Sequence, residues 1–264
     1  MPADLVALHA DRVLVAAVAA LLAGVMNSIA GGGTLLTFPS LIAAGLSPLD
    51  ANATSTVALL PAALSSMLGY RDELSGVQRW TSALAVPCFV GGAAGALLLL
   101  HTSNATFERV VPWLVLGATL LFLTQRPLLR RARGRRRSSD DALPEPPSPT
   151  TTLLLLQFIV AIYGGYFGAG VGILMLAALG FMGFSNIHRM NGLKNWGGFC
   201  MNLVAAVIFA FSDIVDWPVA LTMAVASIAG GYLGARGAQR IPQSLVRGTV
   251  GVIGLVSGVW LLVR

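Results

Sequence analysis

Two glycine-rich stretches interrupt the most apolar parts of the chain: "AGGG", which begins at Ala30, and "AGVG", which begins at Ala169. Adjacent glycines break a helix, and the half-helix that follows presents unpaired backbone N–H groups and the positive end of its dipole. Such a helix start favours an anion. Close packing of helices through small residues is the structural alternative. The backbone donors that we expect at the two breaks are Gly31, Gly32, Gly33, Gly168, Gly170 and Gly172.

Lys194 is the only lysine of the chain, beside 16 arginines, and it lies in "HRMNGLKNWGG", just before an apolar run that begins at Phe199. An ionisable group at this depth marks a functional site, unless its long stem carries the charge back to the surface. A compact ammonium group suits an anion that must also leave again. The hydrogen-bonding side chains that we expect beside it are Asn52, Thr54, Ser55, Asn191 and Asn195, with Asn27 and Tyr166 lining the hairpins.

The 11 acidic residues all fall in predicted loops, at the termini or at the edges of apolar runs. Cation pumps and proton relays commonly place a carboxylate inside the membrane, so the sequence favours an anionic substrate. Coupling to a proton stays open, through His188, Asp50 or the ionisation of the substrate itself. The three histidines lie near loops, and the chain has no HExxH motif and no nucleophile paired with a base. We therefore expect neither an enzyme nor a metal site.

The composition indicates an all-α integral membrane protein with several spans. Hydrophobic residues make up 56% of the 264 residues and charged residues 11%, and the mean hydropathy is +0.78; an average soluble chain carries about 25% charged residues. A secretory signal peptide at 13–23 is the alternative for the N-terminus, but the apolar pattern continues well beyond it. The net charge of +6 comes from basic residues in short loops, which argues for membrane topology and against nucleic acid as a partner.

Apolar segments cover residues 13–30, 35–46, 54–68, 81–100, 110–123, 153–184, 199–211, 219–232 and 246–263. Several are shorter than the roughly 20 residues of a spanning helix. Polar flanks such as 49–55 and 191–198 must therefore lie at membrane depth, which predicts an internal polar site. The predicted organisation is an N-terminal tail at 1–12, a first membrane repeat at 13–125, a linker rich in arginine and proline at 126–152, and a second membrane repeat at 153–264. The linker composition predicts a flexible segment that contacts lipid headgroups.

The distribution of basic residues predicts the orientation in the membrane. A cytoplasmic linker places 14 of the 17 basic residues on the cytoplasmic side and leaves Arg12, Arg109 and Arg264 outside. This requires 13–46 and 153–184 each to be a hairpin that returns to its own side. Each half is then a hairpin followed by three spans, so both termini are periplasmic and the halves are inverted repeats. Inverted repeats with broken helices bind substrate near the membrane midplane.

A weak internal repeat supports this duplication. "AGGGTLL" from Ala30 aligns with "AGVGILM" from Ala169. When Gly31 is set against Gly170, Asn52 falls opposite Asn191, Ser55 opposite Lys194 and Thr56 opposite Asn195. The two halves together predict an anion bound between the two hairpin tips.

On these residues the chain resembles the sulfite exporter TauE/SafE family, also called the toluene sulfonate uptake permeases. The resemblance rests on "GVMNSIAGGGTLLTFPSLIAAGLSPLDANATST" and "GGYFGAGVGILMLAALGFMGFSNIHRMNGLKNWGGFCMNLVAAVIF" and covers nearly the whole chain. It implies a multi-pass transporter of the bacterial inner membrane that moves sulfite, thiosulfate, sulfonates or related organic anions without an organic cofactor. The long linker departs from the compact loop expected of this family.

Three other functions stay open. An anion channel would show a continuous water path and no saturation of flux. A membrane-embedded enzyme lacks any local catalytic motif in the sequence. A membrane scaffold would depend on the arginine-rich linker, so deletion of residues 130–149 would abolish its role and spare transport. The sequence leaves the coupling ion, the direction of transport and homo-oligomer formation open.

Overall fold

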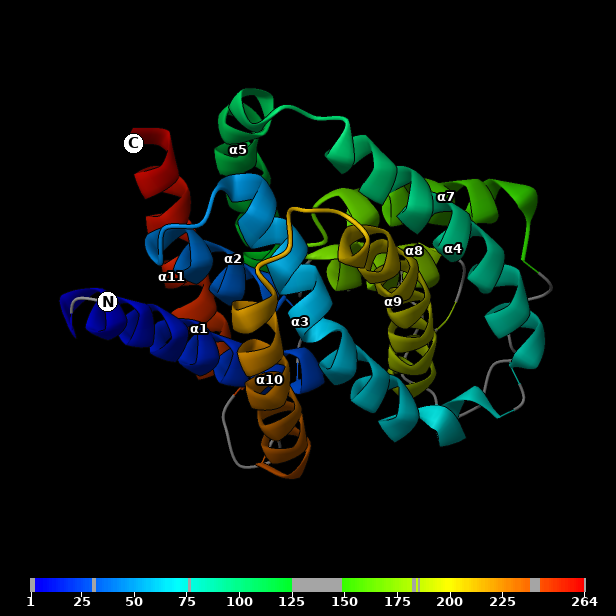
Figure 1. The fold of residues 1–264 in the computed structure, drawn as a ribbon. Helices are drawn as coiled ribbons and strands as arrows, with labels where there is room; N and C mark the ends of the chain where they lie inside the picture. Colours follow the sequence, from blue (N-terminus) through cyan, green and yellow to red (C-terminus); the bar gives the residue numbers. More distant parts are fainter. Residues whose placement is uncertain are drawn as a thin grey trace.

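The computed structural model describes residues 3–29, 32–75, 77–124, 149–181, 184, 186–237 and 243–263. Within these ranges every regular element is a helix, which confirms the predicted all-α fold (Figure 1). Gly31 and most of the predicted linker lie outside the described residues. The elements are α1 (Ala3–Ile29), α2 (Thr34–Ala43), α3 (Pro48–Gly69), the 3₁₀ helix η1 (Arg71–Leu74), α4 (Gln78–Leu100), α5 (Asn104–Leu123), α7 (Thr151–Tyr166), α8 (Val171–Phe181), α9 (Ile187–Ala210), α10 (Trp217–Gly237) and α11 (Gln243–Val263).

The helix lengths fit a membrane protein with two broken hairpins. Helices α4 and α5 and residues 188–210 of α9 are long and apolar enough to cross a membrane. By contrast, α2 has 10 residues and α8 has 11. At about 1.5 Å per residue, each of these rises only about half of the roughly 30 Å hydrocarbon core. Each predicted hairpin is therefore a longer helix, a short break and a half-length helix. The predicted tail at 1–12 is helical from Ala3, as the first turns of α1.

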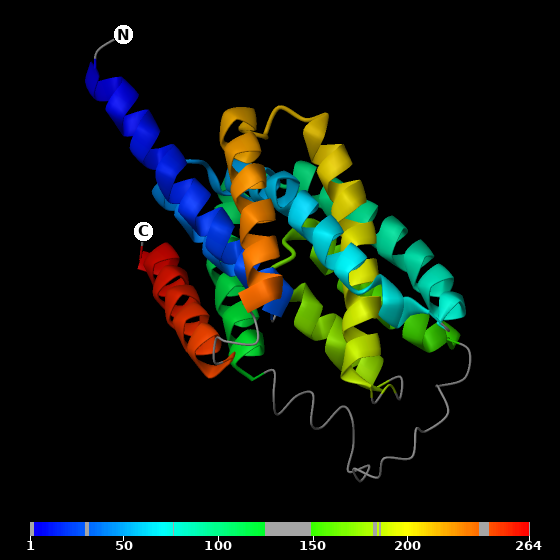
Figure 2. The same cartoon turned by 90° about the horizontal axis from the view of Figure 1, so that it is seen from below.

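The two halves pack with exchanged partners. Helix α1 lies along α10, and its counterpart α7 lies along α4. In the same way α3 contacts α10 while α9 contacts α4, and the paired helices α3 and α9, and α5 and α11, contact each other across the centre. Figure 2 shows α3 running down toward η1 while α9 runs up toward α10. This exchange is the packing expected of a duplicated unit.

Glycines set how closely the exchanged pairs approach. A Cβ atom on Gly24 of α1 would lie 2.7 Å from the backbone nitrogen of Gly231 on α10, and one on Gly95 of α4 would lie 2.7 Å from that of Tyr166 on α7. Real Cβ atoms do not approach backbone so closely, so both crossings require glycine. These glycines serve helix packing through small residues, the structural role considered from the sequence.

Helices α3 and α9 begin with equivalent caps. The Ser47 hydroxyl accepts a hydrogen bond from the Asp50 N–H at 3.2 Å, and the Asn186 side-chain oxygen accepts one from the His188 N–H at 2.9 Å. Each cap satisfies an N–H group that has no partner within the helix. Each helix begins directly after its capping residue, so we take Ser47 and Asn186 as equivalent and compare α3 and α9 position by position from there.

Candidate functional site

The two breaks are built from residues with left-handed backbone conformations. Gly32 has φ of 89° and Gly170 has φ of 72°, values that favour glycine. The Gly33 carbonyl accepts the N–H groups of Leu36 and Thr37, and the Gly170 carbonyl accepts the equivalent N–H groups of α8. Gly33 itself lies in the right-handed region, with φ of −55°. The sequence alignment sets Gly31 against Gly170, and Gly31 lies outside the described residues.

Some of the expected backbone donors are already engaged. The Gly33 N–H donates to the side-chain oxygen of Asn27 at 2.9 Å, and the Gly168 N–H donates to the Tyr163 carbonyl at 3.1 Å. In contrast, no described backbone carbonyl accepts the N–H of Gly172, near the start of α8. This N–H group is the donor that the second break leaves for a ligand.

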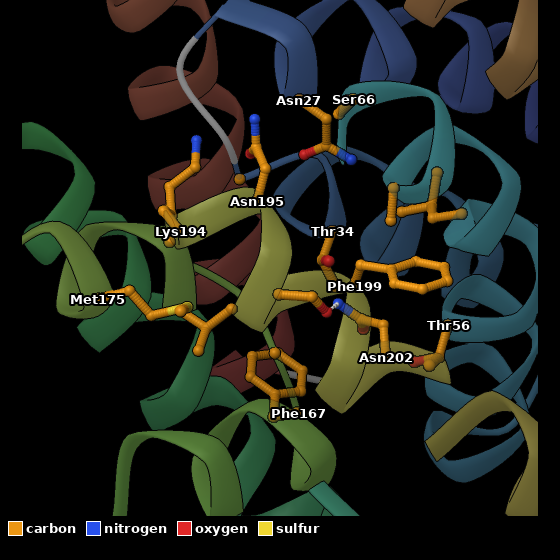
Figure 3. A pocket seen from close by; sticks show the side chains of 17 residues that line it. Asn27, Thr34, Thr56, Ser66, Phe167, Met175, Lys194, Asn195, Phe199 and Asn202 are labelled. Atoms are coloured by element: carbon orange, nitrogen blue, oxygen red, sulfur yellow. Dashed lines mark hydrogen bonds between the residues drawn. The ribbon is translucent and has the colours of Figure 1, made fainter. Parts of the chain in front are cut away.

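A cavity of about 110 Å³ lies between the two breaks, bounded by α3 and α9. This is several times the roughly 10–15 Å³ that one water requires. Figure 3 shows Lys194 and Asn195 extending from α9 with their nitrogen atoms pointing the same way. The lining residues are Asn27, Gly32, Thr34, Thr56, Leu59, Ala63, Ser66, Phe167, Gly168, Val171, Gly172, Met175, Lys194, Asn195, Gly198, Phe199 and Asn202.

Lys194 is the one charged residue among those that line the cavity. Its side chain is 8% exposed, and no described residue forms an ion pair or a hydrogen bond with its ammonium group. The stem packs on the second break, because a Cβ atom on Gly172 would lie 3.3 Å from the Lys194 Cδ. The cavity is therefore a cationic site inside the membrane region that lacks a counter-charge of its own.

The lining residues of α3 and α9 occupy equivalent positions. Thr56 corresponds to Asn195, Leu59 to Gly198 and Ala63 to Asn202, and all six line the cavity. Both helices thus contribute to the cavity from equivalent positions. Of the predicted site residues, the structure gathers Gly32, Gly168, Gly172, Lys194 and Asn195 here, together with Asn27.

Asn52 and Ser55 lie beside the cavity but do not line it. The Asn52 amide donates to the Tyr166 carbonyl at 2.9 Å, which ties α3 to the end of α7. Ser55 is fully buried, and its hydroxyl shares a 2.6 Å hydrogen bond with the Thr37 hydroxyl. Both side chains hold helices against the hairpins.

The remaining predicted residues also lie outside the cavity lining. The Thr54 hydroxyl accepts the Asp216 N–H at 3.0 Å and fixes the turn before α10. Gly170 is buried, where an added Cβ would meet the Ala118 carbonyl oxygen at 3.4 Å, and Asn191 is half-buried. Gly33 is engaged by Asn27, as described above.

Several lining residues were not predicted, notably Thr34, Ser66 and Asn202 and the rings of Phe167 and Phe199. Asn202 lies seven residues after Asn195, which is helical spacing on one face, so the sequence carried a signal for it. The aromatic rings carried none, because they resemble ordinary core residues. Within the described ranges no group of three or more His, Cys, Asp or Glu side chains could hold a metal ion.

Comparisons with known proteins agree with this architecture. The family model "Sulfite exporter TauE/SafE" matches residues 16–261. A protein of Escherichia coli K12 named "Probable membrane transporter protein YfcA" is 30% identical over 92% of this chain and 87% of its own length. A "Probable membrane transporter protein" of Haemophilus influenzae is 28% identical over 85% of this chain and 84% of its own. No solved structure matches the chain.

Proposed function

The chain belongs to the sulfite exporter TauE/SafE family of membrane transporters, and from this premise we propose that it carries small sulfur-containing anions across the membrane by alternating access. Sulfite, thiosulfate and small sulfonates are the proposed substrates. The bound anion contacts the Lys194 ammonium, the Asn195 amide and the N–H group of Gly172. A bacterial inner membrane, with the linker in the cytoplasm and both termini in the periplasm, is the proposed location.

The observation that carries this proposal is Lys194, with no ionic or hydrogen-bond partner among the described residues, in a partly polar cavity between the two breaks. An ammonium group taken out of water is costly unless a partner compensates it. The acceptors and hydroxyls of the cavity supply no negative charge, since its lining contains no carboxylate. A small anion supplies this charge when it binds, and it can depart again because a single cation holds it.

The charge and shape of the cavity favour a monoanion with a short apolar group. Lys194 gives one positive charge, whereas a dianion such as sulfate would enter with one charge uncompensated. Phe167, Phe199 and Met175 form an apolar side of the cavity that suits an alkyl group. We therefore propose that hydrogen sulfite and short alkanesulfonates bind more tightly than the dianions sulfate and thiosulfate.

The exchanged packing of the two halves supports an inverted repeat and alternating access. In transporters built this way, two conformations arise when the halves swap roles around a fixed central site. The cavity lies between the broken helices, where such a site is expected. Both broken hairpins contribute residues to the lining of the cavity, so movement of either hairpin changes the access to the anion.

Uptake into proteoliposomes tests the proposal. Purified protein is reconstituted, and the entry of ³⁵S-labelled sulfite and of a labelled short sulfonate is measured against concentration. We expect saturable uptake in the wild type and a loss of about tenfold or more in Lys194→Ala, because a charge-assisted hydrogen bond contributes about 1.5–3 kcal/mol. Lys194→Arg is the matched control that keeps the charge and changes the shape, and we expect it to retain part of the activity.

Competition by unlabelled anions tests the substrate class. Methanesulfonate is expected to compete and sulfate to compete weakly. Flux that rises linearly with concentration would indicate a channel and overturn the carrier proposal. Uptake that is unchanged in Lys194→Ala would remove Lys194 from the site.

A further inference from the structure

The cavity extends toward only one end of the molecule. Its lining on α3 runs from Thr56 to Ser66, toward the end of that helix, and its lining on α9 runs from Lys194 to Asn202, in the first two thirds of that helix. The end of α3 and the start of α9 lie at the same end of the bundle (Figure 2). We call this the basic end, because Arg71, Arg79 and Arg189 lie there and outnumber the carboxylates of Asp72 and Glu73 in η1.

A cluster of buried aromatic rings closes the other side of the cavity. Phe167 lines the cavity and packs edge to face on Phe38 of α2, with ring centroids 5.2 Å apart. Behind it, Phe107 of α5 contacts both Phe167 and Tyr166, at 6.3 Å and 5.7 Å. Phe38 and Phe107 are fully buried, and Phe167 is 2% exposed. Figure 3 shows Phe167 on the side of the cavity opposite to Ser66 and Lys194.

One hydrogen bond fastens this aromatic cluster to α3. The Asn52 amide donates to the carbonyl of Tyr166, the last residue of α7, at 2.9 Å. The amide oxygen of Asn52 is buried and has no hydrogen-bond partner among the described residues. Asn52 therefore keeps a costly unpaired oxygen in order to make this one contact across the two halves.

The described part of the second half shows no hydrogen bond equivalent to that of Asn52. Asn191 occupies the position of Asn52 in α9, and the described part of α1 ends at Ile29, as α7 ends at Tyr166. Asn191 is half-buried, and no described residue forms a hydrogen bond with its side chain. Met175 of the short helix α8 lines the cavity, whereas Phe38 of the short helix α2 is fully buried. Asn52 thus holds a hairpin in the described conformation, and Asn191 does not.

We propose that Phe38, Phe107, Tyr166 and Phe167, fastened by Asn52, form the gate that closes the site away from the basic end. When this gate opens, the Asn52 bond to Tyr166 breaks and the Asn191 amide binds the Ile29 carbonyl, which closes the basic end. The described conformation is then the one open at the basic end. This inference rests on the alternating access proposed above, and it identifies the residues that set which side is open.

Labelling of a reporter cysteine from each membrane face tests the gate. Thr56→Cys places a thiol on the α3 wall of the cavity, while the native Cys88 and Cys200 are buried and provide a low background. A membrane-impermeant maleimide is applied to intact spheroplasts and to inside-out vesicles that contain the full-length protein. We expect the reporter to react from one face only. Adding Asn52→Leu, which keeps the shape and removes the amide, should raise the reaction rate from the opposite face by about fivefold, as loss of one buried hydrogen bond implies.

Asn191→Leu is the matched control, because Asn191 has no partner in the described conformation. It should leave the reaction from the opposite face low. Phe107→Leu removes one ring from the aromatic cluster and should also raise the reaction rate from the opposite face. It serves as the second variant if Asn52→Leu fails to fold.

A reporter that reacts equally from both faces, or an equal response to Asn52→Leu and Asn191→Leu, would overturn the gate. Labelling needs no transported substrate, so absent uptake with the expected labelling pattern would overturn the substrate and leave the gate.

Discussion

Ser55 and Lys194 occupy the same position in α3 and α9, yet they have opposite surroundings. Ser55 is fully buried, and its hydroxyl is held by Thr37 of the neighbouring hairpin. Lys194 lines the cavity, and no described residue pairs with its ammonium group. The two halves share a backbone plan, but only the second half places a charge at this point.

The same difference extends along both helices. At the three pairs of equivalent positions that line the cavity, α9 contributes Asn195, Gly198 and Asn202, while α3 contributes Thr56, Leu59 and Ala63. At these positions α9 supplies two amides, and α3 supplies one hydroxyl and two apolar side chains. The two helices thus share a backbone plan, whereas the side chains that they present to the cavity differ.

The largest expected effect is on folding. Ser55→Lys gives the first half the residue that the second half has, but at a position without space or water. Burying an unpaired ammonium there should cost about 3 kcal/mol or more. We expect little monodisperse protein after purification in detergent, measured by size-exclusion chromatography. Lys194→Ser, the reverse exchange, should purify normally, because it removes a charge that had no partner. Normal folding of Ser55→Lys would show that the two positions are interchangeable.

The next effect is on substrate affinity, at the equivalent residues Thr56 and Asn195. The Thr56 hydroxyl donates to the Asn52 carbonyl at 2.9 Å within its own helix, whereas no described residue accepts a bond from the Asn195 amide. Asn195→Ala should therefore raise KM about tenfold, since each 1.4 kcal/mol changes affinity tenfold. Thr56→Ala should change KM by about twofold at most. Concentration-dependent uptake measures both, and equal effects would mean that the two halves contribute equally to binding.

Much of the fold could be predicted from the sequence because the membrane leaves few alternatives. Apolar runs must form helices that satisfy their own backbone groups, and glycine clusters must mark breaks that face protein or a cavity. The position of Lys194 in a cavity could be predicted for a related reason, because a single charge at membrane depth is tolerated only in a wet or functional site.

The direction in which each side chain points could not be predicted. Asn52, Thr54 and Ser55 were grouped as ligands because they are polar neighbours. A helix turns about 100° per residue, so Thr54 lies on the opposite face from Asn52, while Asn52 and Ser55 share a face that packs against the hairpins. The structure turns all three toward helix contacts, and Thr56 lines the cavity instead. The aromatic cluster around Phe167 was not predicted, because an aromatic side chain that lines a cavity cannot be told from a core residue in the sequence.

The smallest expected effect concerns the two breaks, each of which is held by one side chain. Asn27 accepts the Gly33 N–H in the first, and the Tyr163 hydroxyl donates to the Ala169 carbonyl at 2.6 Å in the second. Asn27→Ala and Tyr163→Phe should each cost about 1 kcal/mol, or about 2–4 °C in Tm. Thermal unfolding of the purified protein measures this, and Asn27→Asp, which keeps the acceptor, is the control. If only Tyr163→Phe lowers Tm, the first break does not depend on its cap, because water in the cavity replaces Asn27 at the Gly33 N–H.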